Sequence, residues 1–303
     1  MATSARRSWT HKLRRTLMKI GIVQPLIQSG VDALEQNRDH LCQLADQLFG
    51  GGAELVVLPE CANSQYFPAS AQMAAALAEP LDGPSVRRWE MLAAARSGYI
   101  VGGILEQAQD GIYNTAVLVG PRGLLGRYRK MHRFGWEREW LCAGDDLPVF
   151  DLPDLGIRLG MLICYDLRFT GAVNALALSD IDLLAVPTTW TSIGKRILWD
   201  WHGYAPQDHL VIGYAYAHHI AVICSDRVGQ EGTVTFLGAS IAVHPGGEVA
   251  IGPLSGNEPA TAIADLDVKS ARNKRIGSAG DLQRDRRPEQ YRTRIVVEYE
   301  KRT

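Results

Sequence analysis

Two short apolar runs in this chain end at side chains that can react, and they limit what the chain can fold into. The run at 55–58 leads through Pro59 into Glu60, and the run at 159–163 leads directly into Cys164. Runs of four or five apolar residues are typical of buried strands. Because neighbouring strands can end at the same edge of a sheet, the sequence predicts a carboxylate and a thiol that lie close together.

Strand and helix patterns alternate along the chain. Apolar residues recur at helical spacing over 31–48, and three glycines at 50–52 end that helix. The second half repeats the strand–helix rhythm of the first, which predicts an α/β fold with two sheets and outer helices, a four-layer α-β-β-α sandwich. The expected strands are 19–24, 55–58, 99–105, 113–120, 158–163, 183–187, 221–225, 238–244 and 248–252, and the expected helices are 31–48, 85–97, 171–178 and 199–218.

Length, composition and charge narrow the class of protein. With 303 residues, 46% of them hydrophobic, the chain can bury a full core. A net charge of −1 gives no reason to expect nucleic acid as a partner. No apolar run approaches the roughly 20 residues of a membrane span. Five cysteines without CxxC spacing argue against disulfides or a zinc site, and they favour a reducing compartment, so we expect a cytoplasmic protein. We expect no metal and no cofactor.

The first 17 residues differ from the rest of the chain. They contain five basic residues and no acidic one, since the first acid is Asp32. Such a start can be a transit peptide, but it lacks the apolar segment of a secretory signal. We interpret residues 1–17 as a disordered basic extension and residues 18–303 as a single domain that begins with a strand at Met18.

A third reactive side chain, Lys130, lies in the segment Arg129-Lys130-Met131-His132. A nearby positive charge lowers the pKa of a thiol, so Lys130 is a candidate partner for Cys164. Glu60 is a candidate general base for the thiol proton. Each residue also has a plain structural interpretation, as a loop cap, a surface charge or a small core residue. Taken singly, the residues leave both interpretations open.

Together, the three segments around Glu60, Lys130 and Cys164 resemble the Glu-Lys-Cys signature of the carbon-nitrogen hydrolase family, the nitrilase superfamily. The resemblance covers about residues 18–293 and includes the tail segments 271–275 and 285–289. It implies the same α-β-β-α architecture, often with two subunits joined through helix faces. A homodimer or a larger homo-oligomer is therefore expected.

The resemblance also implies a reaction. Glu60 deprotonates Cys164, and the thiolate attacks the carbonyl carbon of a small amide. Lys130 and the backbone N–H of Tyr165 stabilise the oxyanion. Ammonia leaves a thioester, which is hydrolysed by a water that Glu60 activates. The products are a carboxylate and ammonia.

A second carboxylate and several pocket residues are expected near these groups. Glu137 lies seven residues after Lys130 and resembles the family's auxiliary glutamate, thought to orient the substrate, and Glu139 is the alternative. Aromatic residues in the pocket would indicate a small, partly apolar substrate. For each pocket residue the alternative is plain packing. The pocket candidates are Tyr66, Trp136, Thr189 and Trp190.

The residues after Cys164 favour an amide over a nitrile. True nitrilases typically have Trp-Glu there, whereas this chain has Tyr165-Asp166, similar to the amidase and Nit-like branches. We expect Asp166 and Arg168 to form a structural pair. Residues 170–171 (Thr-Gly) stand where the family usually has Pro-Glu, and the segment 214–218 also departs from its pattern, which leaves the substrate open.

Other functions stay as alternatives. A nitrilase, an N-carbamoyl amidohydrolase or an acyltransferase would use the same cysteine chemistry. A papain-like enzyme is conceivable because histidines follow Cys164, but a strand end differs from the protease context. A non-catalytic binding protein would keep the fold without the chemistry. The candidate histidines for such an enzyme are His202, His209, His218 and His219.

Overall fold

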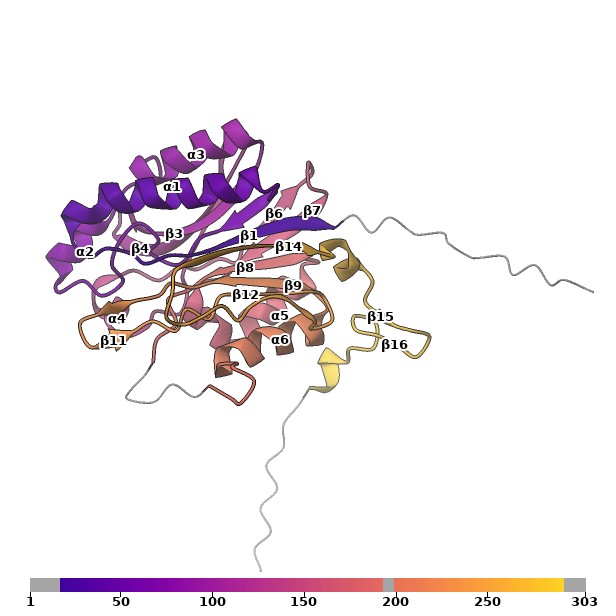
Figure 1. The fold of residues 1–303 in the computed structure, drawn as a ribbon. Coiled ribbons are helices and arrows are strands. Elements are labelled where there is room, and N and C mark those ends of the chain that lie inside the picture. The colour runs from indigo at the N-terminus through magenta and orange to yellow at the C-terminus, as the bar shows by residue number, and fades with distance from the viewer. Residues whose placement is uncertain (1–16, 193–198, 292–303) are drawn as a thin grey trace, which may run out of the picture. The chain divides into compact units, whose positions relative to one another are not determined.

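Two six-stranded sheets form the centre of the fold. The structure is a computed structural model that describes residues 17–192 and 199–291 (Figure 1). In spatial order, the first sheet contains β14 (Ala260–Leu266), β1 (Met18–Gln24), β2 (Leu55–Val57), β3 (Tyr99–Gln107), β4 (Ile112–Gly120) and β5 (Gly123–Arg129). The second contains β13 (Val249–Ile251), β12 (Ile241–Val243), β9 (Ala221–Ser225), β8 (Leu183–Pro187), β7 (Ile157–Met161) and β6 (Val149–Leu152).

The two sheets share one pattern of strand directions. β1, β2 and β3 run parallel in the first sheet, as β7, β8 and β9 do in the second. The outer pairs of both sheets are antiparallel. The strand–helix rhythm that repeats in the sequence thus corresponds to two sheets of similar design.

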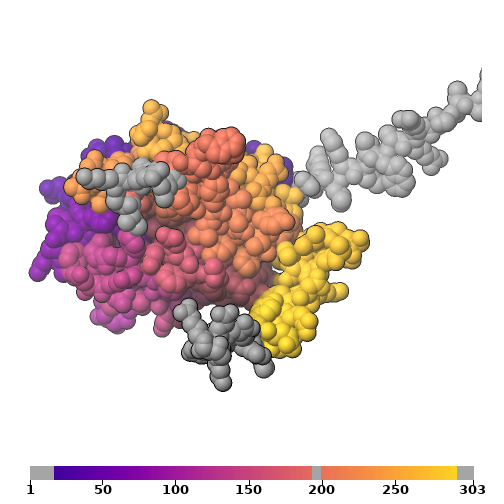
Figure 2. Space-filling view, turned by 90° about the horizontal axis from the view of Figure 1, so that it is seen from below, coloured from indigo at the N-terminus to yellow at the C-terminus, as the bar shows by residue number. Residues whose placement is uncertain are grey.

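Helices cover the outer face of each sheet. α1 (Leu34–Gly50) and α3 (Pro84–Arg96) lie on the first sheet, and α5 (Thr170–Leu178) and α6 (Pro206–His218) lie on the second (Figure 1). The layer order is α-β-β-α, so the predicted four-layer sandwich is confirmed. Figure 2 shows the molecule from below, on the side of α5 and α6. Shorter elements are η1 (Val31–Ala33), α2 (Ala71–Leu77), α4 (Glu137–Trp140), η2 (Cys164–Arg168), β10 (Gln230–Glu231), β11 (Val234–Thr235) and η3 (Val268–Arg272), where η denotes a 3-10 helix.

The sequence of strand β2 is wholly apolar because both of its faces are buried. Leu55 and Val57 belong to the hydrophobic cluster that joins the two sheets. Val56 points the other way and belongs to the cluster formed with α1 and α3. Successive side chains of a strand face opposite sides, and both sides of β2 are covered, so no position is polar. The strand is therefore buried along its whole length, and Glu60 follows shortly after its end.

The structure corrects several expected element boundaries. The helix expected over 199–218 begins only at Pro206. Proline disfavours helical backbone in the residue before it, and Ala205 is extended, with φ −80° and ψ 160°. The expected strand 158–163 ends at Met161 as β7, and the sequence analysis does not predict β5, β6 or β14. Half-buried and exposed residues alternate along β14 up to the buried Leu266, and polar residues interrupt its apolar ones, so the strand lacks a continuous apolar run.

A second, smaller unit follows Arg272. Its described residues contain the antiparallel pair β15 (Arg275–Ile276) and β16 (Gly280–Asp281), and the 3-10 turn η4 (Pro288–Gln290). The single domain expected over 18–303 stays a prediction, and residues 1–16 of the expected extension lie outside the described residues. Within the described ranges, no helix has both the length and the apolar character needed to span a membrane.

Candidate active site

Loops that follow strands carry the reactive side chains to one edge of the sandwich. Glu60 follows β2, Lys130 directly follows β5, and Cys164 follows β7. The backbone N–H of Glu60 donates to the carbonyl of Thr188, just beyond β8, over 3.3 Å. This bond joins the end of a strand in one sheet to the end of a strand in the other. The charges of Glu60 and Lys130 both act on the Cys164 thiol, so the structure brings the three predicted side chains together.

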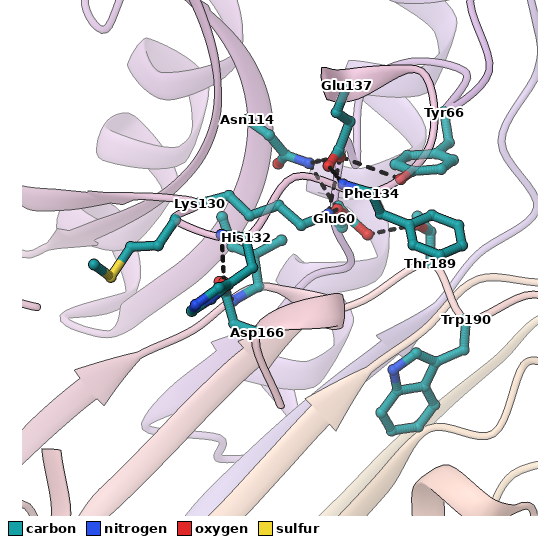
Figure 3. A network of polar contacts seen from close by, with 12 residues as sticks. Glu60, Tyr66, Asn114, Lys130, His132, Phe134, Glu137, Asp166, Thr189 and Trp190 are labelled. Carbon is teal, nitrogen blue, oxygen red and sulfur yellow. Dashed lines mark hydrogen bonds and ion pairs between the residues drawn. The ribbon is translucent and has the colours of Figure 1, made fainter. Parts of the chain in front are cut away.

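Four buried side chains form a closed ring of polar contacts at this edge. Lys130 Nζ lies 2.7 Å from Glu60 Oε1 and 2.9 Å from Glu137 Oε1. Asn114 Nδ2 donates to the same two oxygens over 2.6 Å and 2.7 Å (Figure 3). Each of the four residues is at most 1% exposed. We call Glu60, Asn114, Lys130 and Glu137 the polar ring, in which two donors and two acceptors alternate.

The polar ring contains two acidic groups and one ammonium group, which contacts both of them. Burial acts to lower the pKa of Lys130, but the charges of Glu137 and Glu60 outweigh it and raise that pKa well above its ordinary value. Burial raises the pKa of Glu137; Lys130 opposes this rise and Glu60 adds to it. The ring therefore contains a fixed cation and an acid that takes up a proton more readily than it would in water.

Cys164 occupies a tight turn at the start of η2. Its φ is +45°, in the left-handed region that non-glycine residues seldom adopt. Burial raises the pKa of the Cys164 thiol well above its ordinary value, and Glu60 adds to this rise. Lys130 and a hydrogen bond with the Thr189 backbone act in the opposite direction. The sequence analysis named Lys130 as a charge that lowers this pKa; Lys130 does act in that direction, but burial is the stronger effect.

Thr189 connects Glu60 to Cys164. Its hydroxyl donates to Glu60 Oε2, the carboxylate oxygen outside the polar ring, and its backbone forms a hydrogen bond with the thiol. The two oxygens of Glu60 therefore have different surroundings. Oε1 is held by Lys130 and Asn114, whereas Oε2 lies on the side of Thr189.

Asp166 is a buried anchor between two segments of the site. Its carboxylate accepts hydrogen bonds from the N–H of Ile163 over 3.0 Å, from the Tyr128 hydroxyl over 2.7 Å and from the N–H of His132 over 3.0 Å. Figure 3 shows Asp166 beside His132. The sequence analysis paired Asp166 with Arg168. The structure corrects this, since these three groups surround the carboxylate and Arg168 is exposed.

A pocket opens beside Cys164. Tyr165, Thr189 and Trp190, three of the predicted site residues, contribute to its wall. Large apolar side chains alternate there with polar ones, and Arg168 adds a positive charge, a mixture typical of small-molecule sites. The described part of the chain contains no group of three or more His, Cys, Asp or Glu that could hold a metal ion. The pocket is lined by Phe134, Cys164, Tyr165, Leu167, Arg168, Thr189, Trp190, Thr191, Gln207 and Leu210.

Tyr66 and Trp136, also predicted for the pocket, lie outside this lining. The backbone N–H groups of Tyr66 and Phe67 donate to the Glu231 carboxylate over 2.9 Å and 2.7 Å. The Tyr66 hydroxyl donates to Glu137 Oε1 over 3.1 Å. Trp136 packs edge-on against the Tyr66 ring, with 5.8 Å between ring centres. Because Glu231 fixes the Tyr66 backbone, this tyrosine supports the polar ring instead of the pocket wall.

Of the two candidate auxiliary acids, Glu137 is the one in the polar ring. Its side chain is fully buried and also accepts the N–H of Phe134 over 2.6 Å. Glu139, two residues further along the short helix α4, is exposed. A separation of two residues places side chains on different sides of a helix, so the two acids cannot both face the ring.

Asn114 is the member of the polar ring that the sequence analysis does not predict. It lies in β4, whose other buried residues are mainly apolar, and it is itself 1% exposed. A buried amide needs hydrogen-bonding partners. The signal in the sequence is therefore a polar pair, Asn114-Thr115, inside an otherwise apolar strand. Because an isolated asparagine has no motif of its own, only the fold reveals which groups it meets.

Several known proteins are similar to this chain in sequence or in structure. The model of the carbon-nitrogen hydrolase family matches residues 19–276. A protein named nitrilase from Pyrococcus abyssi is 34% identical over 242 residues, covering 79% of this chain and 87% of the relative. The omega-amidase NIT2 of Bos taurus is 30% identical over 262 residues, covering 80% and 88%. A solved cysteine-to-alanine variant of the Nesterenkonia AN1 amidase, from the nitrilase superfamily, has a TM-score of 0.69 at 24% identity and covers 86% of this chain and 94% of its own.

The chain therefore belongs to the carbon-nitrogen hydrolase family, within the nitrilase superfamily. Its nitrilase and omega-amidase relatives make it a Nit-like member and a hydrolase of that superfamily. The family resemblance drawn from the three sequence segments is confirmed.

Proposed function

We propose that this protein hydrolyses a small amide to a carboxylate and ammonia through a thioester on Cys164. The observation that carries the proposal is the polar ring itself. A base, an ammonium and a second acid are buried in contact with one another, and the thiol on which their charges act opens onto a pocket. The names of the relatives, which include an amidase and omega-amidases, support the same reaction.

The first half of the proposed reaction forms the thioester. Glu60 removes the Cys164 proton through Oε2, and the sulfur attacks the carbonyl carbon of the amide. Negative charge then develops on the carbonyl oxygen, where Lys130 and the Tyr165 N–H stabilise it. Because burial raises the pKa of the Cys164 thiol, its deprotonation accompanies the attack in this mechanism. The tetrahedral species collapses, the C–N bond breaks, and Glu60 returns the proton to the departing nitrogen.

The second half of the reaction releases the acid. Water enters, Glu60 removes its proton, and the hydroxide oxygen attacks the thioester carbon. The C–S bond breaks, and the proton returns to the sulfur. Glu137 acts in both halves by holding Lys130 and orienting the amide group, a role supported by its direct contact with Lys130. The two half-reactions balance in atoms and protons, and neither step uses a cofactor.

A nitrilase is the second candidate, because a relative at 34% identity carries that name. An amide yields an oxyanion and a neutral ammonia, which Lys130 and Glu60 suit. A nitrile first yields a thioimidate whose nitrogen needs protonation, and the Trp-Glu pair typical of nitrilases is absent after Cys164. An N-carbamoyl substrate or transfer to an amine acceptor would also begin at Cys164 and would appear as a different product.

The test is ammonia release from small amides, nitriles and N-carbamoyl compounds, with mass spectrometry for an acyl adduct on Cys164. For an amide and a nitrile with the same side group, we expect the amide to have the higher kcat/KM. A nitrile preference of roughly tenfold, about 1.4 kcal/mol in transition-state binding, would assign the protein to the nitrilase branch. The cytoplasmic location and the homo-oligomer stay predictions, and light scattering on the full chain tests the second.

A further inference from the structure

Asn114 occupies the corner of the polar ring opposite Lys130. It lies in β4 near the start of that strand, and Figure 3 shows its side chain directed at the two glutamates. One nitrogen, Nδ2, donates to Glu60 Oε1 over 2.6 Å and to Glu137 Oε1 over 2.7 Å. Lys130 contacts the same two oxygens. Each acidic oxygen of the ring is thus held by one charged donor, Lys130, and by the neutral donor Asn114, and Glu137 Oε1 accepts in addition from the Tyr66 hydroxyl.

The charges of the ring explain why a second donor is needed. Two buried acids and one ammonium leave an excess of negative charge whenever both acids are ionised. Like charges in a low-dielectric site repel, and one of them then takes up a proton. A second cation would cancel the charge but would also bind the base too strongly to release it. An amide supplies two N–H groups and no charge, so it holds the pair without neutralising it.

We propose that Asn114 is a positioning residue for the reaction, which fixes Glu60 and Glu137 at one separation and occupies Glu60 Oε1 so that Oε2 alone faces the thiol. This inference rests on the proposed function. It concerns how the base is oriented, a feature that neither the family match nor the sequence motifs contain.

The other half of the Asn114 side chain supports a role beyond packing. Its Oδ1 is buried and has no hydrogen-bond partner among the described residues. A buried carbonyl without a partner is unfavourable, so a residue chosen for stability alone would be apolar here. The neighbouring Thr115 offers a contrast, because it faces the other way and donates to Glu106 over 2.7 Å. Glu106 is also bound by Arg129 and lies outside the polar ring.

Removing the Asn114 donor has a definite effect on acid–base behaviour. Lys130, Glu60, Tyr66 and Cys61 are the titratable groups that interact with Glu137, whose pKa burial already raises. A hydrogen bond to an ionised carboxylate lowers its pKa. Without that bond, the pKa of Glu137 rises further. The acidic limb of the kcat/KM profile therefore moves to higher pH.

The experiment compares Asn114→Ala with Thr115→Val, a neighbouring change that removes one hydrogen bond to a buried carboxylate outside the ring. For the amide that wild type hydrolyses best, we expect Asn114→Ala to lower kcat about 100-fold with KM within about threefold. We expect its acidic limb to move up by about one pH unit. Thr115→Val should leave kcat within about threefold and the limb in place, while urea unfolding records the stability of both.

Asn114→Asp provides a second, nearly isosteric variant if the alanine variant folds poorly. The introduced carboxylate repels Glu60 and Glu137, so activity should fall at least as far near neutral pH. Activity should recover in part at lower pH, because the introduced carboxyl group then takes up a proton, loses its charge and can donate one hydrogen bond.

Three results would overturn the inference: an Asn114→Ala variant with wild-type kcat and pH profile, an aspartate variant that is fully active at neutral pH, or the same limb shift in Thr115→Val. The pH dependence of Cys164 alkylation by iodoacetamide is measured on the same variants and needs no substrate. Failure of the proposed function looks different, because wild type itself would then hydrolyse no amide. In that case an alkylation profile unchanged by Asn114→Ala overturns the inference, and a shifted profile supports it.

Discussion

The polar ring and the pocket beside Cys164 are built in opposite ways. The ring consists of charged and amide side chains that are at most 1% exposed and joined at 2.6–2.9 Å. The pocket is lined mainly by large apolar and neutral polar side chains, and some of its residues are partly or fully exposed. Its charged side chain, Arg168, is exposed.

The origin of the two regions in the chain differs as well. All four ring residues come from the first half, after β2, in β4 and after β5. Most pocket residues come from the second half, around η2, the end of β8 and the start of α6. Cys164 stands where the two regions meet. In the proposed mechanism, the acid–base groups therefore come from the first sheet and its loops, whereas the nucleophile and most of the pocket wall come from the second.

The largest expected effect comes from the residue at the boundary. Cys164→Ala should lower kcat by at least about 10³-fold, because the proposed thioester has no other sulfur to form on. The free energy of unfolding should change by no more than about 1 kcal/mol, since the substitution is small. Steady-state kinetics and urea unfolding measure the two quantities. Cys224→Ala, at a buried thiol in β9, is the matched control and should keep its activity.

A Cys164→Ala variant that retains most of its activity would rule out the covalent mechanism. It would also remove the reason to treat the ring and the pocket as two parts of one site.

The second prediction changes the ring without touching the nucleophile. Glu137→Gln removes one of the two acids that hold Lys130, and kcat should fall about 100-fold with KM little changed. Cys164 should still react with iodoacetamide, because Glu60 and Thr189 remain. Glu139→Gln is the control, since that side chain is exposed. Equal kinetics for wild type and Glu137→Gln, with a large loss for Glu139→Gln, would transfer the auxiliary role to Glu139.

The sequence predicted the fold class and three of the four ring residues, on two different grounds. Reactive residues at the ends of buried strands are placed by the strands, and the apolar runs before Glu60 and Cys164 are visible in the chain. Lys130 and Glu137 depended on the family resemblance instead. Their spacing of seven residues matches a motif, but a loop lies between them and Glu137 begins the short helix α4, so no periodicity fixes their contact.

What the sequence could not predict depends on contacts between distant segments. Asn114 donates a hydrogen bond to Glu60, which is 54 positions away in the chain, and no local sequence pattern predicts this contact. Tyr66 was expected in the pocket, whereas Glu231, 165 residues away, accepts a hydrogen bond from its backbone and Tyr66 lies outside the pocket lining. The raised pKa of the Cys164 thiol likewise depends on the fold, because burial at a folded site is stronger than one nearby charge.

The third prediction tests how closely the ring depends on its sheet. A Cβ added to Gly103 in β3 would lie 2.6 Å from Glu60 Cα and 2.7 Å from the Cys61 nitrogen, which is too close for any real contact. Gly103→Ala should therefore displace Glu60, lower kcat by about tenfold and cost about 1–3 kcal/mol in unfolding free energy. Gly213→Ala in α6, where a Cβ meets nothing within 4 Å, is the control and should be neutral or slightly stabilising.

Unchanged kcat in Gly103→Ala, at a measured loss of stability, would show that the base tolerates movement. The ring would then be a looser structure than its short contacts indicate.

The smallest expected effect lies in the pocket wall. Leu210 in α6 lines the pocket and is partly exposed, and its side chain is apolar. Leu210→Ala removes apolar surface worth about 1 kcal/mol of substrate binding, so KM should rise about fivefold for a small aliphatic amide. The value of kcat should change less than twofold, because the reacting groups are untouched. Amides with longer acyl chains should lose less, since the shorter side chain leaves room for them. Measuring kcat and KM across a series of acyl lengths tests this, and a fall in kcat at constant KM would show that the pocket wall also orients the reacting groups, against the division between the two regions.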